Sequence, residues 1–504
     1  MNGRTANLSL LLFLIVSCIC GYGQQKSSIN SKFFTLNVIL EPTAITDTLI
    51  LEIQPDPINE NFPDANRVEA TCRLGKEFRF HVPVRANIFY IRLEKKGHGL
   101  PLFFHYLAEA GDNIVAHIKN IKDEERESRF QMDFTQVDFS GPGSEKYNLQ
   151  YKINQVIMSA GDRADRLNVG KSPEQILVSK AFTTCYLEAD STIEKCGIKI
   201  SDLLRSILKA NSFSTIELNR LSFLFGKQPT TFHLGDSSLT YYRINTSVIE
   251  NSFSEYAKFF SRNYCQYALV KTQLFQYKID YANRPREFYT ENIYQDLKNN
   301  FRDKLKDKLL ILFALDYSNR KEYWEKIAGH EISEVHDPYY KSVLRKFVTE
   351  NEPGKRGYSF VLPDRNGKNV SLKEFKGKIV FIDFWFYRCS ACSQYYISTV
   401  DSTESYFKNN PDVKFITISI DNTKEQWTKG LNSGEYTSDD VINLFAGVHH
   451  PITQFYQVHG APRPILLDRN GNIFSNSSEL RGPFSILKGT IEKALAASAD
   501  QSKR

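Results

Sequence analysis

Beyond residue 23 the sequence has no apolar run long enough to cross a bilayer as a helix. It also lacks a strong excess of one charge, because 64 Lys and Arg against 58 Asp and Glu leave a formal net charge of only +6. Basic and acidic residues are mixed along the chain rather than gathered in a stripe, which argues against nucleic acid as a partner. A second Cys-x-x-Cys pair is absent as well, so the cysteines do not predict a four-ligand zinc site.

The composition is that of a soluble globular protein. It is 41% hydrophobic and 24% charged, and nothing in it indicates disorder. A length of 504 residues is typical of a chain with about two to four domains.

The first 23 residues predict a signal peptide. Arg4 precedes an apolar stretch, residues 8–16, that is too short to span a bilayer. Small residues at 21–23 suit cleavage before Gln24, which would release a soluble product, whereas residues 15–18 resemble a bacterial lipobox that would leave Cys18 lipidated and the protein anchored. Either way, we expect the rest of the chain in the cell envelope, on the periplasmic side, where unprotected thiols oxidise.

Residues 31–141 alternate between apolar and polar side chains. Phe78, Phe80 and Val82 show this period of two most clearly, and similar runs are separated by Pro, Gly, Asn or Asp. The pattern predicts an antiparallel β-sandwich.

Residues 144–349 change to a helical period. Leu305, Leu309, Leu312 and Phe313 would form one face of a helix, and other segments behave in the same way, which predicts an α-helical middle domain. Cys185 and Cys196, eleven residues apart on one predicted helix, would be separated by about 16 Å, so they could form a disulfide only if that helix breaks. The sequence does not indicate partners for Cys72 and Cys265.

A stretch rich in charge, Pro and Gly, residues 350–357, is the predicted linker to a third domain at 358–504. There, strands alternating with helices predict a mostly parallel sheet with helices on both faces. The apolar run 378–386 predicts a buried strand, and Cys389 and Cys392 follow it directly.

This placement favours redox chemistry. If a helix starts at Ser390, Cys389 lies at its N-terminus, where backbone N–H groups and the neighbouring Arg388 would stabilise a thiolate. Cys392, one turn later, would be close enough to form a disulfide with it. Two inert structural thiols are the alternative interpretation.

The region from about Ser359 onward resembles the TlpA/ResA type of secreted thioredoxin-like thiol–disulfide oxidoreductases. The motifs that carry the resemblance come in the family's order: residues 360–378 resemble its first hairpin, 382–385 its central strand, 413–421 the next parallel strand, 458–463 its cis-proline loop and 465–473 its last hairpin. The resemblance covers about the last third of the chain. More loosely, the β region resembles a domain found ahead of such domains in Bacteroidetes envelope proteins.

The resemblance implies roles for individual residues. Asp383 matches the family's buried acid, and burial should raise its pKa so that it accepts the proton of Cys392. Pro462 matches the cis-proline, and with Ala461, Arg463 and Trp385 it is expected to contact substrate. Arg388, Ser390–Ala391 and Arg463 depart from the family's commonest residues, so its redox potential does not transfer.

These features predict an extracytoplasmic thiol–disulfide oxidoreductase, acting as a reductase on protein disulfides and re-reduced by an unidentified thiol donor, with no cofactor and no metal. The alternative, from a different class, is an envelope scaffold with an inactive thioredoxin-like unit. A peroxiredoxin-type peroxidase is disfavoured because it needs a Thr at the position of Phe386.

Overall fold

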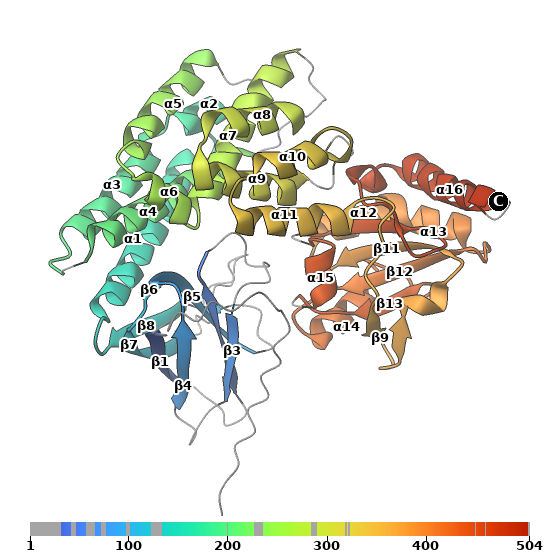
Figure 1. Ribbon diagram of the computed structural model, residues 1–504, viewed down its shortest axis with the longest axis horizontal. Helices are drawn as coiled ribbons and strands as arrows, with labels where there is room; N and C mark the ends of the chain where they lie inside the picture. The colour runs from blue at the N-terminus through green and yellow to red at the C-terminus, as the bar shows by residue number, and fades with distance from the viewer. Residues whose placement is uncertain are drawn as a thin grey trace, which may run out of the picture.

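The computed structural model describes residues 32–41, 47–56, 66–71, 77–96, 101–121, 134–198, 200–225, 235–283, 290–317, 320, 323–448, 450–458 and 460–501. The predicted signal peptide, Cys18 and Cys72 lie outside these ranges. Strands and helices of the first two thirds of the chain form one body, and the C-terminal α/β domain forms a second body beside it (Figure 1). This layout confirms the predicted fold class.

The N-terminal strands form two facing four-stranded sheets. One sheet has the order β4-β1-β7-β8 and the other β3-β2-β5-β6. The strands are β1 Lys32–Glu41, β2 Thr48–Gln54, β3 Asn66–Thr71, β4 Glu77–Val84, β5 Ile88–Lys95, β6 Pro101–Glu109, β7 Asn113–Ile121 and β8 Phe134–Ser140. Along β4 buried and exposed residues alternate as predicted, with the buried set facing the core between the sheets.

The sandwich is antiparallel except at one pair of strands. β1 and β7 run parallel, with Leu36 opposite Ile114, which corrects the expectation of a fully antiparallel arrangement. Alternation of side chains shows which face of a strand is buried, but it carries no information about the direction of a neighbour that is distant in sequence.

The middle of the chain is helical, as predicted. The helices are α1 Glu145–Asn168, α2 Pro173–Leu177, α3 Lys180–Glu194, α4 Asp202–Phe225, α5 Asp236–Glu250, α6 Glu255–Phe260, α7 Tyr264–Asn283, α8 Thr290–Asn300, α9 Asp303–Tyr317, the π-helix η2 Tyr323–Ile327, α10 Ala328–Glu334 and α11 Pro338–Asn351. The predicted face of α9 is buried in the helical core. Cys185 on α3, Cys196 just beyond it and Cys265 on α7 are free thiols.

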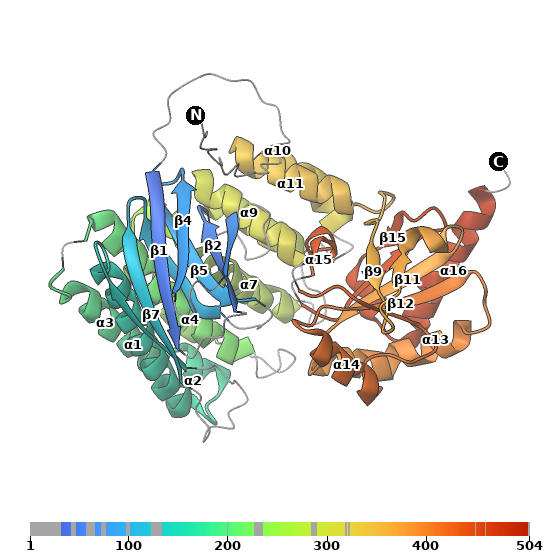
Figure 2. The same ribbon diagram turned by 90° about the horizontal axis from the view of Figure 1, so that it is seen from below.

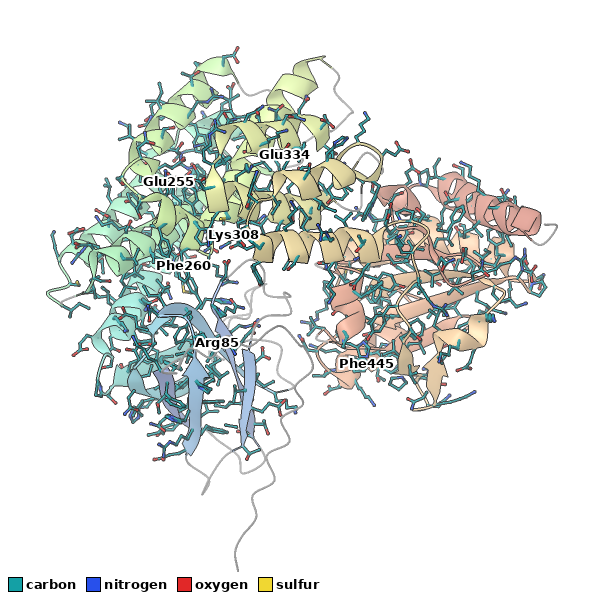
Figure 3. All side chains as sticks on the ribbon, in the orientation of Figure 1. Arg85, Glu255, Phe260, Lys308, Glu334 and Phe445 are labelled. Carbon is teal, nitrogen blue, oxygen red and sulfur yellow. A yellow bond between two sulfur atoms is a disulfide. The ribbon has the colours of Figure 1, made fainter. Side chains whose placement is uncertain are left out.

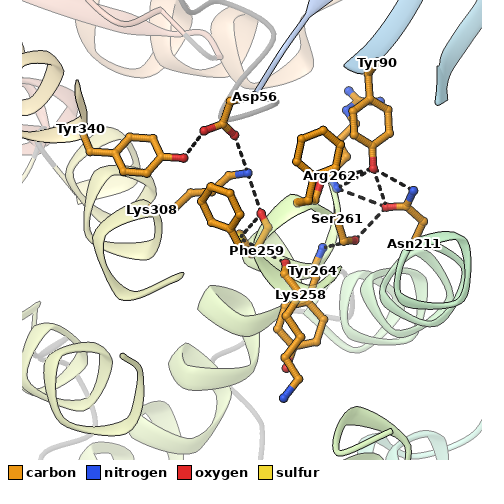
Figure 4. A network of polar contacts seen from close by, with 12 residues as sticks. Asp56, Tyr90, Asn211, Lys258, Phe259, Ser261, Arg262, Tyr264, Lys308 and Tyr340 are labelled. Atoms are coloured by element: carbon orange, nitrogen blue, oxygen red, sulfur yellow. Dashed lines mark hydrogen bonds and ion pairs between the residues drawn. The ribbon is translucent and has the colours of Figure 1, made fainter. Parts of the chain in front are cut away.

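The sandwich and the helices share a core and a polar network. Tyr90 on β5 is buried among helical side chains, and its hydroxyl donates to Asn211 Oδ1 on α4 at 3.1 Å. The ring of Tyr90 stacks on Phe260 with centroids 5.7 Å apart. Figure 3 shows Phe260 on the side of the helical layer that faces the sandwich. Next to it, Asp56 from the end of β2 bonds Lys308 of α9 at 2.8 Å and accepts the hydroxyl of Tyr340 of α11 (Figure 4). These contacts hold the two regions together as one body.

The C-terminal domain is built on a five-stranded sheet of order β13-β12-β11-β14-β15. The strands of this sheet are β11 Ile379–Trp385, β12 Val413–Ser419, β13 Ile442–Phe445, β14 Arg463–Leu467 and β15 Ile473–Ser475, and a separate pair consists of β9 Val361–Pro363 and β10 Asn369–Ser371. The helices are η3 Leu372–Phe375, α12 Ser390–Tyr395, the π-helix η4 Tyr396–Val400, α13 Asp401–Phe407, α14 Lys424–Ser433, α15 Pro451–Phe455, η5 Ser478–Arg481 and α16 Phe484–Gln501. β9 and β10 form the expected first hairpin.

The sheet is mixed, which corrects the prediction of a mostly parallel one. β11, β12 and β13 are parallel, whereas β14 pairs antiparallel with β11 and with β15. β13, which follows α14, lies at one edge of the sheet. α15 and α16 cover opposite faces of the sheet (Figure 2). Ile452 of α15 packs on the face of Ile382, whereas Leu487 of α16 packs on the face of Phe381.

The predicted linker is paired with the second body. α11 ends at Asn351. Beyond it the Gly354 N–H donates to the carbonyl of Ile473 at 2.7 Å, and the Ile473 N–H donates to the carbonyl of Lys355 at 2.7 Å. Asn476 also donates to the carbonyl of Asn351 at 2.9 Å. Within the described ranges, no helix combines the length and apolarity needed to span a bilayer.

Candidate active site

Strand β11 is the central strand of its sheet, and the two cysteines follow its carboxyl end. Every residue of Ile379–Trp385 is buried, because β12 and β14 flank the strand and apolar side chains pack on both of its faces. An apolar run of this kind is typical of a strand covered on both sides. The chain leaves β11 at Phe386 and reaches Cys389 after a short turn.

Cys389 and Cys392 form a disulfide at the start of α12. Cys389 is the N-cap residue of that helix, and the backbone N–H of Cys392 points at its sulfur at 3.1 Å. Both side chains are nearly enclosed, with exposed fractions of 5% for Cys389 and 2% for Cys392. An N–H group directed at Cys389 Sγ would stabilise its thiolate in the reduced protein.

A cis peptide bond faces the disulfide. It joins Ala461 to Pro462, as expected from the sequence, and the Ala461 carbonyl oxygen lies 3.5 Å from Cys389 Sγ. Pro462 is buried, whereas Ala461 keeps some exposed surface. The loop before β14 therefore lies directly against the sulfur that is expected to react.

Asp383 lies inside the domain on β11. It is 4% exposed, and its Oδ1 has no hydrogen-bond partner in the described part of the chain. Burial, reinforced by the negative charge of Glu404, raises the pKa of Asp383 to about 8. At neutral pH the carboxyl group is therefore mostly protonated, in keeping with the rise expected from the sequence.

Neighbouring segments of the domain hold the side chains of Trp385 and Arg463. Trp385 has no exposed area, and its ring stacks on Tyr436 with centroids 5.0 Å apart. The guanidinium of Arg463 donates to the carbonyls of Tyr456 at 3.3 Å and Asn476 at 2.8 Å. Their side chains brace the loops around the cysteines, and the substrate contact expected of them from the sequence stays a prediction.

Comparison with known proteins matches this domain. A thioredoxin-like family model matches residues 377–473. A ResA thiol–disulfide oxidoreductase of Bacillus thuringiensis subsp. konkukian is 46% identical over 43 residues, which is 8% of this chain and 25% of that protein. Another ResA, from Bacillus thuringiensis strain Al Hakam, is 29% identical over 121 residues, 24% of this chain and 66% of the relative.

Residues 377–473 form a thioredoxin-like domain related to ResA.

The chain spans only a quarter to about two thirds of the length of these relatives. Among solved structures, a thiol:disulfide interchange protein from Bacteroides sp. is 30% identical and matches 29% of this chain and 90% of its own, with a TM-score of 0.25. All three matches involve less than a third of the chain.

Glu404 is a residue of the thioredoxin-like domain that the sequence did not single out. It lies on α13, is 8% exposed, and accepts a hydrogen bond from Ser438 at 3.1 Å while its Oε1 has no partner in the described ranges. Burial raises its pKa to about 8, and its charge is one cause of the raised pKa of Asp383. No spacing rule connects Glu404 to the cysteines, because only the packing of α13 brings it near β11.

An open hollow of about 560 Å³ is lined by residues that flank Cys389 and Cys392 in the thioredoxin-like domain. Its lining includes Arg388, Gln394, Ile397, Glu435 and Tyr436, so it carries both charges and one exposed aliphatic side chain. Across the described residues no group of three or more His, Cys, Asp or Glu is arranged to hold a metal ion.

Proposed function

We propose that this protein is an extracytoplasmic thiol–disulfide oxidoreductase that acts as a reductase on protein disulfides. The observation that carries the proposal is the Cys389–Cys392 pair at the start of α12, with the cis Ala461–Pro462 bond in front of it. Asp383, buried on the preceding strand, adds a proton-transfer group.

In the proposed reaction the reduced protein donates two electrons. The Cys389 thiolate attacks one sulfur of the substrate disulfide, that bond breaks, and the other sulfur leaves as a thiolate and takes a proton from water. Cys392 then loses its proton and attacks Cys389 Sγ. This forms the Cys389–Cys392 disulfide and releases the second substrate sulfur as a thiolate. A thiol donor must reduce the pair again before the next cycle.

Asp383 would accept the proton of Cys392 in the second step. Its raised pKa places its ionisation near that of a thiol, so a proton can pass between them at little cost. In the reverse step the protonated acid would return that proton to the Cys392 thiolate.

Substrate would dock as an extended segment along Ala461 and Pro462, whose backbone can pair with it. In this proposal Trp385 and Arg463 keep the loops in place from behind, and the hollow beside Cys389 takes side chains that flank the substrate cysteine. The sandwich and the helices would recruit or orient the substrate.

We also propose that the protein works in the cell envelope, either soluble or anchored through a lipid on Cys18. Fractionation of cells producing the wild type and Cys18→Ala distinguishes these forms. A lipoprotein moves from the membrane to the soluble fraction on this substitution, whereas a secreted soluble protein does not change fraction.

A redox titration tests the enzymatic proposal. The protein without residues 1–23 is equilibrated in graded thiol buffers, and free Cys389 and Cys392 are trapped with a mass-tagging reagent. A reversible two-electron transition near that of thioredoxin, about −270 mV, supports a reductase, whereas a value near about −120 mV indicates an oxidant. Failure of the pair to exchange would leave the scaffold alternative, in which Cys389→Ser keeps all partner binding.

A further inference from the structure

The turn between β11 and the disulfide is held by three consecutive backbone N–H groups. The N–H of Tyr387 donates to Asp421 Oδ1 at 2.9 Å, that of Arg388 donates to the Tyr436 hydroxyl at 3.0 Å, and that of Cys389 donates to Phe386 O at 3.2 Å. Asp421 follows β12, and Tyr436 lies in the connection between α14 and β13. Two of the three acceptors therefore come from segments distant in sequence.

The middle residue of this turn has an unfavourable backbone conformation. Arg388 has a φ of 69°, in the left-handed region that a side chain like arginine seldom adopts. Such a conformation persists only where surrounding contacts favour it over the relaxed one. The Tyr436 hydroxyl supplies this contact, because it accepts a hydrogen bond from the backbone N–H of Arg388.

Tyr436 is itself firmly placed. It is 5% exposed, and its ring lies parallel to Trp385, at an interplanar angle of 5°. Trp385 in turn packs against Gly430 of α14, where an added Cβ would lie 2.4 Å from its ring. The ring of Tyr436 is thus held by stacking, while its hydroxyl accepts from the Arg388 N–H and also interacts with the neighbouring Glu435.

The conformation of Arg388 bears directly on the reacting sulfur. Cys389 follows it and must present its sulfur both to the Cys392 N–H and to the cis-proline loop. If Arg388 relaxed to a negative φ, the chain would enter α12 in another direction and the alignment of Cys389 would be lost in part of the molecules.

We propose that Tyr436 is a positioning residue for Cys389, acting through the backbone of Arg388. The inference rests on the proposed thiol–disulfide exchange. It gives the α14–β13 connection a role in the reaction: the hydroxyl of Tyr436 keeps the turn in the geometry in which the Cys389 thiolate is stabilised.

The substitution Tyr436→Phe isolates this role, because it keeps the stacked ring and removes only the hydroxyl. We expect about a fivefold to tenfold lower rate of disulfide reduction, and a Cys389 thiol pKa higher by roughly half a unit to one unit. The pKa is measured on the reduced protein by the pH dependence of alkylation, with tandem mass spectrometry to separate Cys389 from Cys392. Tyr406→Phe is the matched control, since Tyr406 is an exposed tyrosine on α13 whose hydroxyl bonds Glu492.

A second variant tests whether Tyr436 acts through residue 388. Glycine adopts a positive φ without strain, so the effect of Tyr436→Phe should fall to within about twofold when Arg388→Gly is also present. An equal loss in both backgrounds would overturn the proposal, as would an unchanged Cys389 pKa in Tyr436→Phe. If the wild type does not exchange disulfides, the proposed function fails, whereas the alkylation pKa still decides whether Tyr436 positions Cys389.

Discussion

Asp383 shows how much the chemistry of one side chain depends on its surroundings. On β11 it is enclosed by apolar strands, and the nearby charge of Glu404 further disfavours its ionisation. A carboxyl group that is an ordinary acid in the unfolded chain therefore becomes one whose pKa is about 8.

The raised pKa of Asp383 predicts that the stability of the folded protein decreases with rising pH. Between about pH 4 and 8 the folded protein keeps a proton that the unfolded chain releases, so the free energy of unfolding falls as pH rises through this range. Asp383→Asn should lose that part of the slope and gain stability relative to wild type toward pH 8. Urea unfolding at several pH values measures the difference, and the same difference at pH 4 and pH 8 would contradict the prediction.

In the same variant the resolving step should become slower and less dependent on pH. Asp383→Asn removes the proton acceptor, so we expect about a tenfold to hundredfold lower rate of Cys389–Cys392 disulfide formation from the mixed disulfide at pH 8. Stopped-flow kinetics with a fluorescent peptide disulfide measures this step. Glu404→Gln is the comparison, because it neutralises the neighbouring acid and leaves Asp383 in place.

The two cysteines should behave differently when each is replaced. Cys392→Ser cannot resolve the mixed disulfide, so Cys389 should remain covalently bound to substrate, visible as a shifted band on a non-reducing gel. Cys389→Ser should form no such species and should reduce insulin at least about a hundredfold more slowly than wild type. Trapping through Cys392 in Cys389→Ser would reverse the assigned roles.

At the scale of elements, the site depends on the fit between β11 and α14. Gly430 lets the helix approach so closely that the ring of Trp385 fills the space where a side chain would begin. The same ring stacks on Tyr436, whose hydroxyl bonds the N–H of Arg388. The packing of α14 against the end of β11 therefore also determines the position of the turn before Cys389.

A methyl group at position 430 should disturb this fit. Gly430→Ala would place a carbon 2.4 Å from the Trp385 ring, and we expect it to lower the free energy of unfolding by about 1 to 3 kcal/mol. Guanidinium unfolding followed by tryptophan fluorescence measures the change. Gly489→Ala on α16 is the matched control: no atom lies within 4 Å of its added Cβ, so it should stabilise by about 0.5 to 1 kcal/mol.

At the scale of the whole molecule, an ion pair between buried Lys308 and the partly exposed Asp56 joins the sandwich to the helices. The Lys308 side chain is fully enclosed and bonds Asp56 at 2.8 Å and the carbonyl of Phe259 at 2.9 Å (Figure 4). Tyr340 of α11 donates to the same carboxylate, so Asp56 also ties in the helix that leads to the thioredoxin-like domain.

Removal of this carboxylate should weaken the first body. Asp56→Ala leaves a buried ammonium group without its counter-charge, and we expect a loss of about 2 to 3 kcal/mol and faster proteolysis between the sandwich and the helices. Glu188→Ala, which breaks the exposed pair with Arg163, should cost less than about 1 kcal/mol. Equal effects of the two substitutions would show that Asp56 does not join the regions.

The sequence by itself determined the features that depend on neighbours along the chain. The alternation around Phe78 and the helical face of Leu305 predicted the right elements, because burial of one face imposes its period on the residues. The strand before Cys389 followed from its apolar run, whereas the hairpin at 360–378 and the proline at 462 were recognised by their resemblance to the TlpA/ResA type. Cys389, Cys392 and Asp383 could therefore be identified without a structure.

Only the tertiary structure decided which distant residues meet. Glu404 beside Asp383, Tyr436 on the amide of Arg388 and Asp56 on Lys308 are pairs that no spacing rule connects. The parallel pairing of β1 with β7 belongs to the same class. The periodicity of apolar residues and the local motifs indicate which face of each segment is buried. Which other segment covers that face depends on the packing of the whole chain.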